Sequence, residues 1–253
     1  DAVSSEFSSY ESLKTTPHDY QLIETEEDAR RICEKFTSSK ILVLDTETTS
    51  TNAIDAELVG LSFSIEEGNA FYVAIPNERE KAERIVNIFK PLYESTEILK
   101  IGQNIKYDME VLMNYGVRLA APMFDTMIAH YVLQPEQKHN MDTLAETLLH
   151  YQTIHIDELI GPKGKSQRNM RDLPPSTVCD YAAEDADVTL RLYNVLKPRL
   201  KEADVEELFY NIEMPLVPVL AEMEMNGVRL DTGALAETSK VLTERMQQIE
   251  QSI

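Results

Sequence analysis

The stretch "ILVLDTETTS", residues 41–50, decides the fold because four aliphatic residues lead directly into two carboxylates. Successive side chains of a strand point to opposite faces, so Asp45 and Glu47 share a face with Val43, and Leu44 fills the other face. This pattern predicts a strand that is buried on both faces, near the centre of a sheet. Acids at the end of such a strand lie in a crevice and not in bulk water.

Two later segments place an acid inside an apolar helical stripe, where a solvated face would be expected to carry it. In residues 104–115, Asp108 lies in line with apolar neighbours three and four positions away. In the predicted helix of residues 176–200, Asp185 lies in line with Tyr181, one turn earlier, whose hydroxyl can reach the same crevice. Two other acids of that helix fall off the stripe and are expected to be solvated: Glu184 and Asp187.

Buried acids without partners need an explanation, because an unpaired ionised carboxylate costs several kcal/mol or more to bury. Ion pairing is the simplest one, but no Lys or Arg recurs at matching positions. Ligation by carboxylates alone favours magnesium or manganese over zinc. We therefore predict a site for hard divalent cations, Mg²⁺ or Mn²⁺, with four acidic ligands: Asp45, Glu47, Asp108 and Asp185.

Composition limits the possible partners. The net charge of −20 argues against a broad surface that follows nucleic-acid phosphates. Basic residues concentrate in "GPKGKSQRNMRD", residues 161–172, where phosphates would be expected, although a solvated surface loop is the alternative. Its basic residues are Lys163, Lys165, Arg168 and Arg171.

The longest apolar runs are too short to cross a bilayer, and no export signal opens the chain, so we expect no membrane association. Cys33 and Cys179 lack metal-ligand spacing and are interpreted as reduced core thiols. Both observations favour a cytoplasmic protein.

The 253 residues divide into three predicted parts. Residues 1–19 are polar and Ser-rich and are interpreted as a linker. Residues 20–200 alternate strand-like and helix-like segments, which predicts an α/β domain with a mixed sheet of about five strands flanked by helices. Residues 201–253 predict two helices around a turn, at the start of a neighbouring helical domain. The chain begins without Met and stops within a helical pattern, so we expect a piece of a longer protein.

Three segments resemble the motifs of the DEDD exonuclease superfamily in its tyrosine-bearing branch: "LDTET" (44–48), "GQNIKYDMEVL" (102–112) and "YAAEDADVTLRLY" (181–193). A fourth, "IEMPLVPVLAEMEMNGVRLD" (212–231), is similar to the segment that joins the proofreading domain to the polymerase thumb in family A DNA polymerases. The resemblance extends from about residue 20 to the C-terminus.

The resemblance implies a ribonuclease H-like fold followed by a truncated thumb. It implies a 3′→5′ exonuclease that releases nucleoside 5′-monophosphates from single-stranded or frayed DNA ends, as part of a polymerase that acts in replication and repair. Asp45 would bridge two metal ions, Glu47 and Asp185 would help to hold the first, and Asp108 would hold the second through its water shell. Tyr181 would orient the attacking water.

The resemblance also implies substrate contacts. Related enzymes carry a bulky aliphatic residue at the position of Thr51 and an aromatic residue at Ile156, so we expect a weaker hold on the terminal base. Gln103 and Asn104 would contact the last sugar, although Asn104 equally suits a helix N-cap. Lys138 and its neighbour His139 would approach the substrate backbone, although Lys138 equally suits an ordinary surface position.

Two alternatives stay open. Exoribonucleases of the ribonuclease D type share the acids and the tyrosine, but they continue into a different helical domain. Some relatives keep the exonuclease fold only as a silent scaffold after losing metal ligands, whereas all four acids and Tyr181 are present here.

Overall fold

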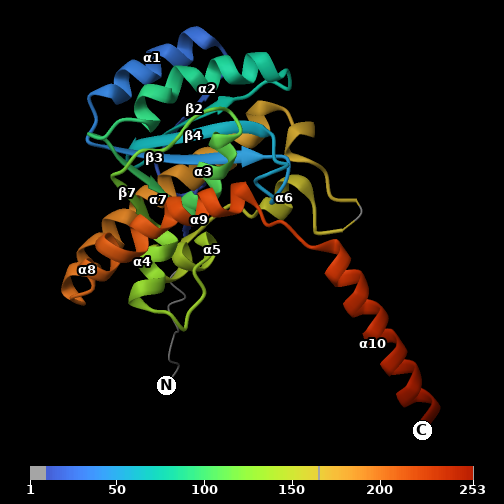
Figure 1. Cartoon of the computed structure of the whole chain (residues 1–253). Helices are drawn as coiled ribbons and strands as arrows, with labels where there is room; N and C mark the ends of the chain where they lie inside the picture. Colours follow the sequence, from blue (N-terminus) through green and yellow to red (C-terminus); the bar gives the residue numbers. More distant parts are fainter. Residues whose placement is uncertain (1–9, 165, 253) are drawn as a thin grey trace, which may run out of the picture. The chain divides into compact units, whose positions relative to one another are not determined.

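The computed structural model describes residues 10–164 and 166–252, and these divide into two compact units between Glu222 and Met223. The first unit is built on a six-stranded mixed sheet in the order β2-β5-β4-β3-β6-β7 (Figure 1). β4 is antiparallel to both of its neighbours, and the other pairs are parallel. The strands are β2 (Asp19–Ile23), β3 (Ile41–Thr48), β4 (Leu58–Glu66), β5 (Asn69–Ala74), β6 (Leu99–Gly102) and β7 (Met123–Asp125).

The predicted mixed sheet is confirmed, with β3 inside it as expected, but the main sheet has six strands instead of about five. The two strands without a sequence prediction are the outer ones, β2 and β7. Two further short strands, β1 (Glu11–Ser12) and β8 (Tyr151–Gln152), form a separate parallel pair. β1 falls inside the segment interpreted as a linker, of which residues 1–9 lie outside the described part.

Helices surround this sheet, and the longer ones each bury one apolar face. Those of the first unit are α1 (Glu26–Thr37), α2 (Arg79–Tyr93), α3 (Ile105–Met113), α4 (Thr126–Leu133), α5 (Met141–Leu144), α6 (Ile156–Ile160), α7 (Pro175–Glu202) and α8 (Glu206–Leu208), with short helical turns at Ala145–Leu149, Met170–Asp172 and Phe209–Glu213. α9 (Met214–Asn226) follows, and α10 (Thr232–Ser252) belongs to the second unit. Among the described residues, no helix combines the length and apolar character needed to cross a membrane.

The helices α1 and α2 cover one face of the sheet (Figure 1), where an aromatic cluster fixes them. Phe63 of β4 lies 5.8 Å from Phe36 of α1 and 4.8 Å from Phe89 of α2, measured between ring centroids. All three side chains are fully buried. Burial of large aromatic rings is among the strongest contributions to a core, so this cluster sets which face of β4 points towards the two helices.

The opposite face of β4 carries the small residues Gly60, Ser62 and Ser64 in succession, and α7 packs on β4. The facing side of α7 is also small, with buried alanines at positions 182, 183 and 186. Small residues on both sides let a helix approach a sheet closely. Because Asp45 pairs with Ser62 and Glu47 with Gly60, both acids point towards α7.

Candidate active site

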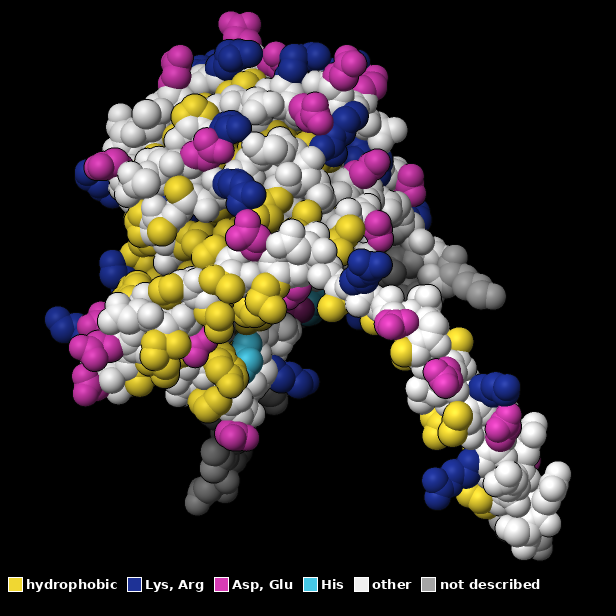
Figure 2. All heavy atoms as spheres, in the orientation of Figure 1, with side chains coloured by type: hydrophobic (Ala, Val, Ile, Leu, Met, Phe, Trp, Pro, Cys, Tyr) yellow, Lys and Arg dark blue, Asp and Glu magenta, His cyan; other side chains and the backbone are white. Residues whose placement is uncertain are grey.

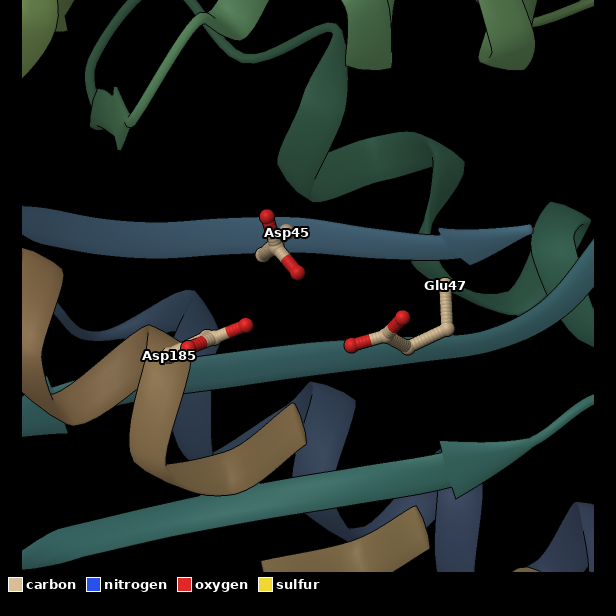
Figure 3. Close-up of side chains that lie close together, drawn as sticks. All are labelled: Asp45, Glu47 and Asp185. Carbon is tan, nitrogen blue, oxygen red and sulfur yellow. The ribbon is translucent and has the colours of Figure 1, made fainter. Parts of the chain in front are cut away.

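Three carboxylates converge at the end of the central strand (Figure 3). Asp45 and Glu47 come from β3, and Asp185 comes from α7. Each offers one carboxylate oxygen, and these oxygens lie within 4.8 Å of one another. The structure thus brings together three of the four acids that the sequence predicts as metal ligands.

The electrostatics of this cluster oppose its own ionisation. Burial raises the pKa of Asp45 to about 6. Burial, and then the neighbouring Asp45, hold the pKa values of Glu47 and Asp185 well above their usual range. No Lys or Arg of the described chain is among the main influences on these three pKa values. The cluster therefore keeps its full negative charge only when a cation offsets it.

Asp108 lies beside this cluster and is not one of the three converging acids. It is only 2% exposed on α3, and its Oδ1 accepts a 2.7 Å hydrogen bond from the hydroxyl of Thr46. Thr46 points to the opposite face of β3 from Asp45, because neighbouring strand residues alternate. Burial and then the negative charge of Asp45 raise the pKa of Asp108, so the two carboxylates repel each other.

Tyr181 lies one turn before Asp185 on α7, as the spacing predicts. Its hydroxyl lies close enough to the Asp185 carboxylate for the two groups to shift each other's pKa. The carboxylate of Asp185 and then burial raise the pKa of this phenol, so Tyr181 is a neutral hydroxyl at any physiological pH.

The donor set suits a hard divalent cation. Carboxylate oxygen is the ligand that Mg²⁺ and Mn²⁺ prefer. Among the described residues, Oε1 of Glu47 is buried without a hydrogen-bond partner, which is costly unless something else binds it. A metal ion beside Asp45 and Asp185 would satisfy that oxygen.

A cavity of about 700 Å³ opens at Glu47. Four of the residues predicted to contact substrate line it: Thr51, Asn104, Ile156 and Arg168. Tyr107 also lines it, with its hydroxyl donating a 2.5 Å hydrogen bond to the Ser50 carbonyl. Tyr107 was not predicted, although it directly precedes Asp108 in the second motif. The cavity is large enough for a nucleotide-sized ligand.

Other predicted contacts are arranged differently. The Gln103 amide is already engaged, since Nε2 donates to the His139 carbonyl at 2.7 Å and Oε1 accepts from the Thr126 hydroxyl. Asn104 adopts a left-handed backbone conformation and makes no side-chain cap. Asn104 occupies the N-cap position of α3, as the N-cap alternative expects, but it is the Asp125 carboxylate that accepts from the amide of Ile105.

The basic residues of the loop differ in surroundings. Lys163 is exposed, as is Lys138 on its own loop, and Lys165 lies outside the described residues. Arg168 lines the cavity and donates to the Leu159 carbonyl at 2.9 Å. Arg171 instead donates to the Leu58 carbonyl at 2.5 Å, which ties the loop to β4.

The expectation that Glu184 and Asp187 are solvated is wrong, because both are fully buried. Asp187 accepts hydrogen bonds from the Tyr20 hydroxyl at 2.8 Å and from the Gly68 amide at 2.7 Å. Arg191 pairs with it at 2.5 Å. The strand β2 and the β4–β5 turn cover this flank of α7, which a single apolar stripe does not reveal.

The Tyr72 ring of β5 lies beside the backbone opposite Glu47, an arrangement that no sequence pattern predicts. A Cβ placed on Gly60, the cross-strand partner of Glu47, would lie 2.0 Å from the Tyr72 ring. Burial and then the Glu47 carboxylate raise the pKa of Tyr72, whose hydroxyl donates to the Val59 carbonyl at 3.3 Å. The missing side chain at position 60 makes room for this ring.

Together, the mixed sheet, the carboxylates at the end of its central strand and the acid-bearing α7 define a ribonuclease H-like exonuclease fold. The family model described as 3′-5′ exonuclease matches residues 20–201. The chain belongs to this family and is homologous to the exonuclease part of DNA polymerase I.

Individual relatives agree with this placement. The chain is 38% identical over 226 residues to DNA polymerase I of Pseudomonas aeruginosa, covering 85% of this chain and 25% of that protein. The first relatives matched are thus about four times as long as the matched segment.

Solved structures share the fold at low sequence identity. The POL domain of Pol1 from M. smegmatis, in complex with DNA primer-template and dNTP, matches with a TM-score of 0.73 and 18% identity over 90% of this chain and 36% of that chain. Brucella melitensis NrnC with bound Mg²⁺ matches at 0.61 and 20% identity, over 84% of this chain and 95% of that one. Escherichia coli RNase D matches at 0.65 and 18% identity, over 81% and 51%.

Proposed function

We propose that this protein is a metal-dependent 3′→5′ exonuclease that removes nucleoside 5′-monophosphates from the 3′ end of DNA. The observation that carries the proposal is the convergence of Asp45, Glu47 and Asp185 within 4.8 Å in a member of the exonuclease family. Their raised pKa values and the unpartnered Oε1 of Glu47 support a cationic cofactor.

Asp45, Glu47 and Asp185 would hold the cofactor, with Asp108 contributing from α3. When bound, two Mg²⁺ or Mn²⁺ ions would supply activation of water and stabilisation of the leaving oxygen in an in-line displacement. Tyr181 would orient the attacking water through its hydroxyl, which Asp185 keeps in place. Water would add to phosphorus, the bond from phosphorus to the 3′-oxygen would break, and that oxygen would take up a proton.

The cavity beside Glu47 would hold the terminal nucleotide. Thr51 and Ile156 would contact its nucleobase, and Arg168 would lie near its phosphate. Asn104 lies close enough to this cavity to contact the last sugar. Gln103 would support the site without touching substrate, because its amide is engaged within the protein. Lys138 lies on an exposed loop, and we give it no more than a supporting role.

DNA is the proposed substrate, in single-stranded or frayed form, because the 38% identical relative is a DNA polymerase. Ribonuclease D shares the fold at 18% identity, which does not distinguish the two sugars. Labelled DNA and RNA of the same sequence, digested in parallel, would separate the two activities.

The wider role follows from the relatives and is also a proposal. We infer that the exonuclease proofreads in the cytoplasm, in replication and repair, as part of a DNA-directed DNA polymerase whose remaining chain is its main partner. Apolar side chains gather over α8 and α9 (Figure 2), and Ile212 and Val219 there are 58% and 51% exposed. Exposed apolar patches of this kind mark interaction surfaces. We infer that residues 201–253 begin the polymerase thumb.

The test uses single-stranded DNA labelled at its 5′ end, so that digestion from the 3′ end gives a ladder of shortened products. We expect a ladder with Mg²⁺, none with EDTA, and a rate at least about a thousandfold lower for Asp45→Asn, since metal activation contributes several kcal/mol. Equal rates for wild type and Asp45→Asn would favour a silent scaffold.

A further inference from the structure

Glu184 directly precedes Asp185 on α7, yet it takes no part in the carboxylate cluster. Its side chain is fully buried, and each oxygen has a partner. Oε1 accepts a 2.7 Å hydrogen bond from the Tyr151 hydroxyl, and Oε2 accepts a 2.6 Å hydrogen bond from the backbone amide of Ile154. A buried carboxylate with two such donors is a strong and directional anchor.

The anchored segment leads into the wall of the cavity. Ile154 lies two residues before Ile156, where α6 begins, and both Ile156 and Ile160 line the 700 Å³ cavity. Adjacent residues of a helix point about 100° apart, so Glu184 reaches sideways to this segment while Asp185 faces the cluster. One short stretch of α7 therefore carries a cluster acid and the anchor of the cavity wall.

We propose that Glu184 is a positioning residue that fixes the α6 wall relative to Asp185 and so sets how the 3′-terminal nucleotide is held. The proposal rests on the exonuclease function proposed above. Loss of the anchor would let the wall move while the three cluster acids stay in place. The expected effect is therefore on substrate binding and not on the metal requirement.

Two variants of Glu184 test this. Glu184→Leu removes both acceptors at similar size, and we expect KM for single-stranded DNA to rise about tenfold, the equivalent of about 1.4 kcal/mol, with kcat within about threefold of wild type. Glu184→Gln keeps a carbonyl for the Ile154 amide and an NH₂ group that can donate to the Tyr151 hydroxyl. It should restore KM to within about twofold of wild type.

Tyr151→Phe is the matched control, because it removes the bond to Oε1 and leaves the Ile154 anchor in place. We expect its KM to stay within about twofold of wild type. In Glu184→Leu, the Ile154 amide should exchange its hydrogen at least about tenfold faster, because its acceptor is gone. The magnesium concentration that gives half-maximal rate should be unchanged.

A purely structural role for Glu184 would lower the unfolding midpoint of Glu184→Leu and leave the KM of the folded enzyme unchanged. That outcome overturns the proposal, as does a fall in kcat or a shifted magnesium requirement at unchanged KM. If Glu184→Leu does not fold, Glu184→Met replaces it, and failure of both to fold also overturns the proposal. Absence of activity in wild type would instead contradict the exonuclease function, whereas the Ile154 exchange rate reports on the anchor alone.

Discussion

The Thr46 hydroxyl donates a 2.7 Å hydrogen bond to Oδ1 of Asp108, across the contact between β3 and α3. This bond joins the residue between the two motif acids of β3 to the acid of the second motif. It also favours the ionised form of Asp108 by lowering its pKa against the larger effect of burial.

Thr46→Val should therefore raise the pKa of Asp108 further. We expect a rate about tenfold lower near pH 7 and an acid limb of the pH–rate profile that moves to higher pH, since one hydrogen bond to a charged group contributes about 1.5–3 kcal/mol. Thr46→Ser keeps the hydroxyl and should follow the wild-type profile. Identical profiles for Thr46→Val and wild type would contradict a role for this bond.

Metal binding should be visible as stability, because a ligand that binds only the folded state stabilises it. We expect Mg²⁺ to raise the unfolding midpoint of wild type measured against EDTA. Asp45→Asn should show little or no such rise, since it removes one of three converging ligands. Calorimetry or dye-based melting at fixed pH measures both, and an equal rise in the two proteins would place the metal elsewhere.

The carboxylate cluster should make the metal-free protein less stable as pH rises. The pKa of Asp45 is about 6 in the folded state and about 3.9 when unfolded. A raised folded pKa contributes stability that is fully present below about pH 4 and is lost as pH rises through about 6.

In EDTA, Asp45→Asn should therefore gain stability relative to wild type between pH 4 and pH 7, by about 1–3 kcal/mol. Comparing the two proteins cancels the titration of groups that Asp45 does not influence, and the relief of Glu47 and Asp185 adds to the gain in the same direction. A constant difference in the free energy of unfolding across this range would show that Asp45 is not perturbed.

Two arginines of the same loop should behave differently. Arg168 lines the cavity, so Arg168→Gln should weaken DNA binding and lower the slope of log K against log salt by about one. Arg171 is bonded to the Leu58 carbonyl, so Arg171→Gln should lower the unfolding midpoint and leave the salt slope unchanged. Fluorescence anisotropy at several salt concentrations measures the slope, and an unchanged slope for Arg168→Gln would remove it from the DNA site.

Ile156 lies on the cavity wall and is 42% exposed. Ile156→Phe should lower KM about fivefold, because stacking of a base on an aromatic ring contributes about 1–3 kcal/mol. Ile156→Val is the control, since it changes the side chain without adding a ring. A KM for Ile156→Phe that is equal to or above that of wild type would place the terminal base elsewhere.

The central strand and its acids could be predicted because their pattern is local. Four aliphatic residues followed by Asp45 and Glu47 specify a two-sided strand with its acids on one face, whatever packs around it. Asp108 and Asp185 stood out for a similar reason, as acids within apolar helical stripes. Each of these signals lies within one element.

The features that the sequence did not predict depend on contacts between different helices and strands. Glu184 and Asp187 fall outside the apolar stripe of α7, but the segment after β8 and the strand β2 cover its flanks and bury both. The outer strands are short, and β7 has only three residues, which is too few for an alternation to be recognised. The position of the Tyr72 ring beside Gly60, opposite Glu47, depends on the register between β4 and β5, which no single segment encodes.

The packing of the Tyr72 ring beside Gly60 has a consequence for comparing this protein with its homologues. A side chain at position 60 would push the Tyr72 ring aside, directly across the strand pair from Glu47. Replacing this glycine by an uncharged residue with a side chain could thus inactivate an exonuclease of this kind, although every acidic motif residue would still be present. Surveys that infer proofreading from intact motifs alone should therefore also ask whether a glycine stands opposite the motif glutamate.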